Sequence, residues 1–185
     1  VVLLSLMLGW REDLLGALGK PAGKSVGLPF GLTFAIEYNR YVLAKDSASL
    51  CPFPPLENET ALIIPGLTRV PGWTIQAAVL SPSEVKIAEP KDAGFSAYFD
   101  FSRTGSNLTV RSCCPGDRFQ PLGMGRPKKL SRFMIDARIP RLWRRRVPVV
   151  ASPEQIIWVV GWRISEQVKV TGATIKVLRL EFRRD

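Results

Sequence analysis

The 185-residue sequence contains no histidine. Catalysis by an imidazole base, as in Ser-His-Asp and Cys-His sites, is therefore excluded for this chain, and so are imidazole metal ligands. Cysteine is scarce: the chain has Cys51 and the adjacent pair Cys113 and Cys114. An odd count with this spacing fits neither a disulfide framework nor a zinc site. We therefore expect three reduced thiols, as in a cytosolic protein.

Long apolar runs are also missing. The largely apolar first ten residues follow no basic region and fall far short of the roughly 20 residues of a membrane span. Apolar residues at three- and four-residue spacing from Leu3 to Leu18 predict an amphipathic helix instead. Because Val1 is not an initiator methionine and this helix would be entered midway, we expect the chain to be part of a longer protein.

Positive charge is abundant, and it is concentrated in the second half of the chain. Residues 1–100 hold 8 basic and 10 acidic side chains, whereas residues 101–185 hold 18 basic and 6 acidic ones. This asymmetry predicts a polyanionic partner, most commonly a nucleic acid. An anionic membrane surface is the competing interpretation, but no basic amphipathic helix of useful length is present.

The hydrophobic pattern predicts an α+β fold in two parts. After the first helix, short alternating segments at 26–28, 32–36 and 41–43 predict a small β-hairpin sheet. We expect residues 1–50 to form one domain, the proline-containing residues 51–60 to be a linker, and residues 61–185 to form a second, strand-rich domain with short helices. Within that second domain we expect strands at the following positions: 61–64, 73–80, 97–101, 108–113, 147–151, 156–160, 168–170 and 175–182, the last with a bulge after Val177.

Two groups of cations suggest phosphate binding. Lys128 and Lys129 precede a predicted short helix with a buried stripe of Leu130, Phe133, Met134 and Ala137. Cations at a helix start are unfavourable by about 0.3–1 kcal/mol each, and a bound phosphate would reverse that penalty. Five arginines, which repel one another unless an anion lies between them, form the second group: Arg138, Arg141, Arg144, Arg145 and Arg146.

Several segments carry a family resemblance. They read CPGDRFQPLG at 114–123, KKL at 128–130, IDA at 135–137, IP at 139–140, WVVGWRI at 158–164 and VKVT at 168–171. In order and spacing these segments resemble the C-terminal domain of bacterial tRNA(Ile)-lysidine synthetase. The segment LPFGL at 28–32 resembles, more loosely, the middle region of the same family.

This resemblance implies a fold and a function. The second domain would be a mixed β-sandwich-like fold shared with a part of phenylalanyl-tRNA synthetase. The parent enzyme would be an ATP-dependent ligase that joins lysine to the wobble cytidine of the minor isoleucine tRNA in the cytoplasm. Its nucleotide-binding SGGxDS-type loop is not found in this chain. ATP, magnesium and lysine are therefore expected in a missing N-terminal catalytic domain, and this chain by itself is expected to have no catalytic residue, cofactor or metal.

The partner expected for this chain is the tRNA acceptor stem, with no membrane and a possible homodimer. A stand-alone basic RNA- or ribosome-binding module is the alternative, and a peripheral membrane module is a third interpretation. Nine basic side chains are expected at the tRNA backbone: Arg111, Arg118, Lys128, Lys129, Arg138, Arg141, Arg144, Arg145 and Arg163.

Overall fold

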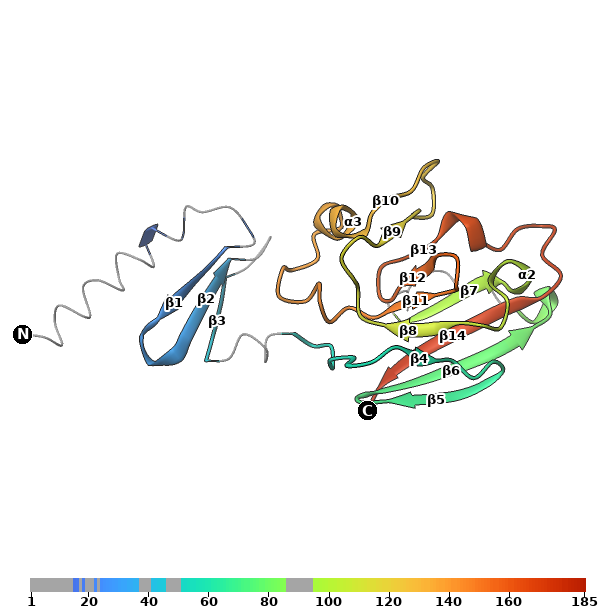
Figure 1. The fold of residues 1–185 in the computed structure, drawn as a ribbon, viewed down its shortest axis with the longest axis horizontal. Coiled ribbons are helices and arrows are strands. Elements are labelled where there is room, and N and C mark those ends of the chain that lie inside the picture. The colour runs from blue at the N-terminus through green and yellow to red at the C-terminus, as the bar shows by residue number, and fades with distance from the viewer. Residues whose placement is uncertain are drawn as a thin grey trace, which may run out of the picture. The chain divides into compact units, whose positions relative to one another are not determined.

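The computed structural model describes residues 15, 16, 18, 22, 24–36, 41–45, 51–85 and 95–185 (Figure 1). The chain divides into two compact units. The first consists of Val1–Pro52 with Arg138–Arg144, and the second of Phe53–Ala137 with Arg145–Asp185. The helix predicted between Leu3 and Leu18 lies almost entirely outside the described residues.

The first unit contains the predicted small sheet. Its antiparallel strands have the order β1-β2-β3 and the bounds Ser25–Leu28, Leu32–Ile36 and Tyr41–Ala44. A tight 3-10 turn, Pro29–Gly31, joins the first two strands, with φ of 63° at Phe30 and 72° at Gly31. Leu28, Phe34 and Ile36 form the core of this unit, which confirms the alternation expected from the sequence.

The second unit is built from two antiparallel sheets. The five-stranded sheet has the order β13-β12-β11-β8-β4, with the bounds Arg163–Ile164, Ile156–Val159, Val149–Ala151, Thr109–Arg111 and Thr60–Ala61. The four-stranded sheet has the order β5-β6-β14-β7, with the bounds Gly66–Val70, Trp73–Leu80, Val177–Arg184 and Ser96–Asp100. Neighbouring strands within each sheet are often distant in sequence, as Figure 1 shows for β14 between β6 and β7.

Aromatic side chains join the two sheets into a sandwich. Trp158 of β12 makes edge-on contacts with Phe99 of β7 and Phe182 of β14, with ring centroids 5.8 and 5.3 Å apart. All three side chains are buried. Phe53, within the proline-containing segment, stacks on Trp73 at 6.1 Å, so this segment packs into the second unit. The predicted α+β sandwich is therefore confirmed, with aromatic packing as a main source of its stability.

Several of the strands and the bulge that the sequence predicts for the second unit differ from the structure. No bulge follows Val177, since β14 pairs with β6 in unbroken register from Val177–Leu80 to Arg184–Trp73. Val177 and Leu178 are both buried because both faces of the sheet are covered at that end. Residues 168–170 are not a strand: the 3-10 turn η5 (Glu166–Val168) occupies this place, with the Ser165 hydroxyl accepting a hydrogen bond from Gln167 N–H. Four strands were not expected: β5, β13, β9 (Arg118–Phe119) and β10 (Lys128–Lys129).

Asp100 is a buried acid at the end of β7 and the N-cap of the short helix α2 (Phe101–Thr104). Its carboxylate accepts hydrogen bonds from the Ser102 amide at 3.0 Å, from the Ser102 hydroxyl at 2.5 Å and from the Thr174 hydroxyl at 2.8 Å. Burial alone would raise the pKa of Asp100, but these hydrogen bonds outweigh it and the pKa is lowered.

We expect Asp100 to make the stability of the chain depend on pH. Because its folded-state pKa lies below the unfolded-state value, its contribution is present above the unfolded value and is lost as pH falls through the folded one. Urea unfolding of wild type and Asp100→Asn at stepped pH between about 6 and 2 would measure this effect. The variant should be less stable near neutral pH by about 2 kcal/mol and should lose less stability on acidification. Parallel pH profiles for the two proteins would contradict this prediction.

Candidate nucleic-acid interface

A basic hairpin projects from the second unit. Strands β9 (Arg118–Phe119) and β10 (Lys128–Lys129) pair antiparallel, with Lys129 opposite Arg118 and Lys128 opposite Phe119. Arg118 and Lys129 are both exposed. Like charges directly opposite each other in a sheet are destabilising. A bound anion between them would turn this repulsion into a favourable interaction.

Hydrogen bonds connect the hairpin loop to β13 and to the residues that follow it. Leu122 N–H donates to the Ile164 carbonyl at 2.9 Å, and Glu166 N–H donates to the Gln120 carbonyl at 2.9 Å. The Glu166 carboxylate accepts a hydrogen bond from Gly123 N–H at 2.8 Å, which lowers the pKa of Glu166. These bonds hold the loop in one place relative to the five-stranded sheet.

Helix α3 (Leu130–Asp136) follows β10 directly, so Lys128 and Lys129 do stand at a helix start. Leu130, Phe133 and Met134 are buried, as predicted, whereas Ala137, the fourth residue of the predicted stripe, lies at the C-cap and is only partly buried. Phe133 packs edge-on against Phe119 of β9, with centroids 5.1 Å apart. Helix α3 therefore packs against strand β9 and holds the hairpin in place.

Asp117 connects the end of β8 to this region. Its two carboxylate oxygens accept hydrogen bonds at 2.9 Å from the two terminal nitrogens of Arg111, and one of them also accepts from Cys114 N–H at 2.7 Å. The hydrogen bonds with Asp117 raise the pKa of Arg111 further. The backbone carbonyl of Asp117 accepts from Leu130 N–H at 2.8 Å. Asp117 thus ties β8, the turn after it and the start of α3 together.

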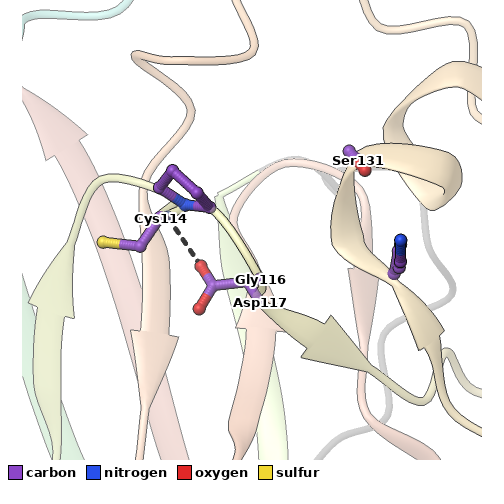
Figure 2. Close-up of a pocket in the computed structure, with 6 residues that line it drawn as sticks. Cys114, Gly116, Asp117 and Ser131 are labelled. Carbon is purple, nitrogen blue, oxygen red and sulfur yellow. Dashed lines mark hydrogen bonds between the residues drawn. The ribbon is translucent and has the colours of Figure 1, made fainter.

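A pocket of about 310 Å³ opens beside the hairpin (Figure 2). It is lined by the turn at residues 114–117 and by Lys129 and Ser131. Figure 2 shows the turn on one side and Ser131 on the first turn of α3 on the other. The sulfur atoms near this site are thiols, and burial raises the pKa of the Cys113 thiol, so Cys113 has no nucleophilic activation.

Four of the nine predicted cations have partners within the protein. Arg111 binds Asp117, and Lys128 binds the Asp136 carboxylate at 3.0 Å. The two others donate to backbone carbonyls: Arg118 to Pro127 at 3.2 Å and Arg144 to Ile139 at 2.9 Å.

The other five predicted cations are exposed: Lys129, Arg138, Arg141, Arg145 and Arg163. Arg138 and Arg141 belong to the first unit and the other three to the second. In the second unit the structure brings together Arg118, Lys128 and Lys129 on the hairpin, while Arg163 lies on the edge strand β13. The assignment of all nine to tRNA stays a prediction.

Sequence reasoning missed two residues of this surface. Arg126 is exposed in the hairpin loop, and Ser131 lines the pocket. Arg126 could have been found from its place two residues before Lys128. Ser131 carried no sequence signal, because only the fold brings its hydroxyl opposite the turn at 114–117.

The described residues do not fit ATP with magnesium. The glycine-containing loop around Gly123 and Gly125 joins two strands of a hairpin, whereas a phosphate-binding loop of the nucleotide type joins a strand to a helix. Across the described ranges, no group of three or more acidic or cysteine side chains is placed to hold a metal ion.

No helix within the described part of the chain is long and apolar enough to cross a membrane.

The second unit is an α+β domain of two antiparallel sheets with an exposed basic hairpin. Comparison with known proteins shows which family this domain resembles. Residues 108–181 match the family model of the TilS substrate C-terminal domain. The crystal structure of a TilS C-terminal domain is similar with a TM-score of 0.55 and 27% identity, over 69% of this chain and 98% of that one. A phenylalanyl-tRNA synthetase β-subunit fragment from Pyrococcus horikoshii shows a weaker likeness, with a TM-score of 0.42 and 18% identity over 47% of this chain and 27% of that one.

Full-length relatives agree with this assignment. The tRNA(Ile)-lysidine synthase of Dehalococcoides mccartyi is 41% identical over 93% of this chain, and that of Caldanaerobacter subterraneus is 36% identical over 96%. The chain is therefore similar to the C-terminal part of tRNA(Ile)-lysidine synthases over most of its length, as the sequence resemblance indicated. It spans 36% and 37% of the length of these two relatives.

Proposed function

We propose that this chain binds tRNA through the basic hairpin of its second unit, as the C-terminal portion of a tRNA(Ile)-lysidine synthase. The observation that carries this proposal is the pairing of exposed Arg118 and Lys129 across β9 and β10. Two opposed cations on a braced hairpin suit the closely spaced phosphates of a nucleic-acid backbone. The names of the relatives support tRNA as the nucleic acid.

The proposed partner is the acceptor stem of the minor isoleucine tRNA. The arrangement of cations on a rigid surface suits a regular duplex, whose backbone is recognised by shape and charge. Aromatic residues of the second unit lie mainly in the sandwich core, where bases cannot stack on them, as Trp73, Phe99 and Trp158 illustrate.

The proposed reaction of the longer protein is the ATP-dependent joining of lysine to the wobble cytidine of this tRNA, in the cytoplasm. ATP, magnesium and lysine would bind to a catalytic part outside these residues, because the described residues fit neither the nucleotide nor the metal. The role of this chain is then to hold the tRNA while the chemistry takes place elsewhere.

We expect the purified chain to bind the minor isoleucine tRNA and to form no lysidine. Filter binding or fluorescence anisotropy would measure affinity, and pyrophosphate release with nucleoside analysis would measure turnover. A ribosomal RNA fragment of equal length is the matched competitor. Turnover by the chain would contradict the assignment of chemistry to another part, and stronger binding to the ribosomal fragment would favour a ribosome-binding module instead.

A further inference from the structure

We propose that the pocket beside the hairpin is a seat for one phosphate group of the bound RNA, with Lys129 and Ser131 as its side-chain donors. This inference rests on the proposed function and adds a specific site to it. The pocket is lined by residues 114–117, Lys129 and Ser131.

The size of the pocket suits this ligand. Its volume of about 310 Å³ is at the lower end of the range of small-ligand sites. A phosphate group is small enough for a space of this volume. The turn that forms one wall requires a glycine, since Gly116 has a φ of 91°.

The charge of the pocket is positive although an acid lines it. Asp117 would repel an anion if its carboxylate were uncompensated. Instead, both of its oxygens accept hydrogen bonds from Arg111. One of them also accepts from Cys114 N–H, the bond that Figure 2 shows as a dashed line. The pair of Arg111 and Asp117 is neutral as a unit, so Lys129 determines the sign of the charge that the pocket presents.

The two side-chain donors of the pocket, Lys129 and Ser131, are accessible to a phosphate. Lys129 and Ser131 are both exposed, and neither side chain has an ion-pair or hydrogen-bond partner among the residues that the structure describes. Arg118, opposite Lys129 in the hairpin, adds a second positive charge next to the pocket. A phosphate oxygen between these groups would receive charge-assisted hydrogen bonds and would relieve the repulsion between the two cations.

Two variants of the full chain test the site. Lys129→Ala removes the charged donor, and Ser131→Glu places a carboxylate in the pocket. Lys176→Ala and Ser106→Glu are the matched controls, since both residues are exposed elsewhere in the second unit. Affinity for an acceptor-stem RNA duplex is measured at several salt concentrations, and melting temperature reports the fold.

We expect Lys129→Ala to weaken RNA binding by about five- to tenfold and Ser131→Glu by at least as much. The slope of log affinity against log salt should become shallower by about 0.9 for Lys129→Ala, as for one lost phosphate contact. Inorganic phosphate should shift the backbone amide resonances of Gly116 and Ser131 in the wild type and not in Ser131→Glu. The controls should remain within about twofold of the wild type after allowance for their charge.

The outcomes separate this inference from the proposed function. If the wild type binds RNA and the variants match their controls, the phosphate site is overturned, and phosphate shifts confined to other residues would overturn it too. If the wild type binds no RNA but phosphate shifts Gly116 and Ser131 saturably, the proposed function fails and an anion site at the pocket stands.

Discussion

Replacing the three exposed cations of the hairpin together, Arg118, Arg126 and Lys129, should nearly abolish RNA binding while leaving the fold intact. Each lost phosphate contact on a duplex reduces the salt slope by about 0.9, so the triple variant should lose up to about 2.7 in slope. At about 0.1 M salt the affinity should fall by at least about 100-fold. The melting temperature should change little, because all three side chains are exposed.

A triple variant of equal charge is the control for this result. Arg69, Lys176 and Arg183 belong to the four-stranded sheet or the residues next to it, and all three are exposed. Strand β5, which carries Arg69, lies far from β9 and β10 in Figure 1. Equal loss of affinity in both triple variants would mean that net charge, and not the hairpin, determines binding.

Replacing Arg111 by alanine should destabilise the second unit by about 3 kcal/mol, because it leaves the largely buried Asp117 carboxylate without a charged partner and with only the Cys114 N–H as a donor. The side chains of Arg111 and Asp117 are only 18% and 12% exposed, so water replaces the lost partner poorly. Chemical denaturation of the full chain measures this loss. The same variant should also weaken RNA binding, since an unpaired carboxylate would then line the pocket beside Lys129.

The double variant Arg111→Met, Asp117→Leu is the matched control. It removes both charges and keeps similar side-chain volume, so it should recover much of the stability that the single variant loses. A single variant as stable as the wild type would show that the pair contributes nothing at this position. A double variant no better than the single one would show that the Cys114 N–H needs the Asp117 oxygen.

Local sequence patterns predicted those strands and helices whose apolar residues recur at a regular spacing. Strand β6 was predicted residue for residue, at 73–80: apolar and polar side chains alternate from Trp73 to Ala77, and an apolar run continues to Leu80. The first three strands and the buried stripe of α3 were predicted for the same reason. Strand β13 was missed because it has only two residues, which are too few to show a period.

The candidate site, like the fold, was predicted only in part from the sequence. Charge alone directed attention to the hairpin, since Arg118, Lys128 and Lys129 stand out in the sequence. Their unequal roles could not be predicted, because Lys128 pairs with Asp136 at the far end of α3 and leaves Lys129 as the exposed partner of Arg118. The pocket has no sequence signal at all, since its two walls come from separate segments.

The sequence by itself determined the α+β composition, the resemblance to tRNA(Ile)-lysidine synthases and the concentration of positive charge in the second half, because these depend on residue types and short-range order. The tertiary structure alone decided the strand orders of the two sheets and which charges are neutralised within the protein. The strand orders depend on contacts between residues far apart in the chain, and the neutralised charges depend on how the chain turns between Arg111 and Asp117 and between Lys128 and Asp136. Arg111 binds Asp117 across the turn after β8, and Lys128 binds Asp136 at the end of α3 while Lys129 stays exposed, an arrangement that no local pattern encodes.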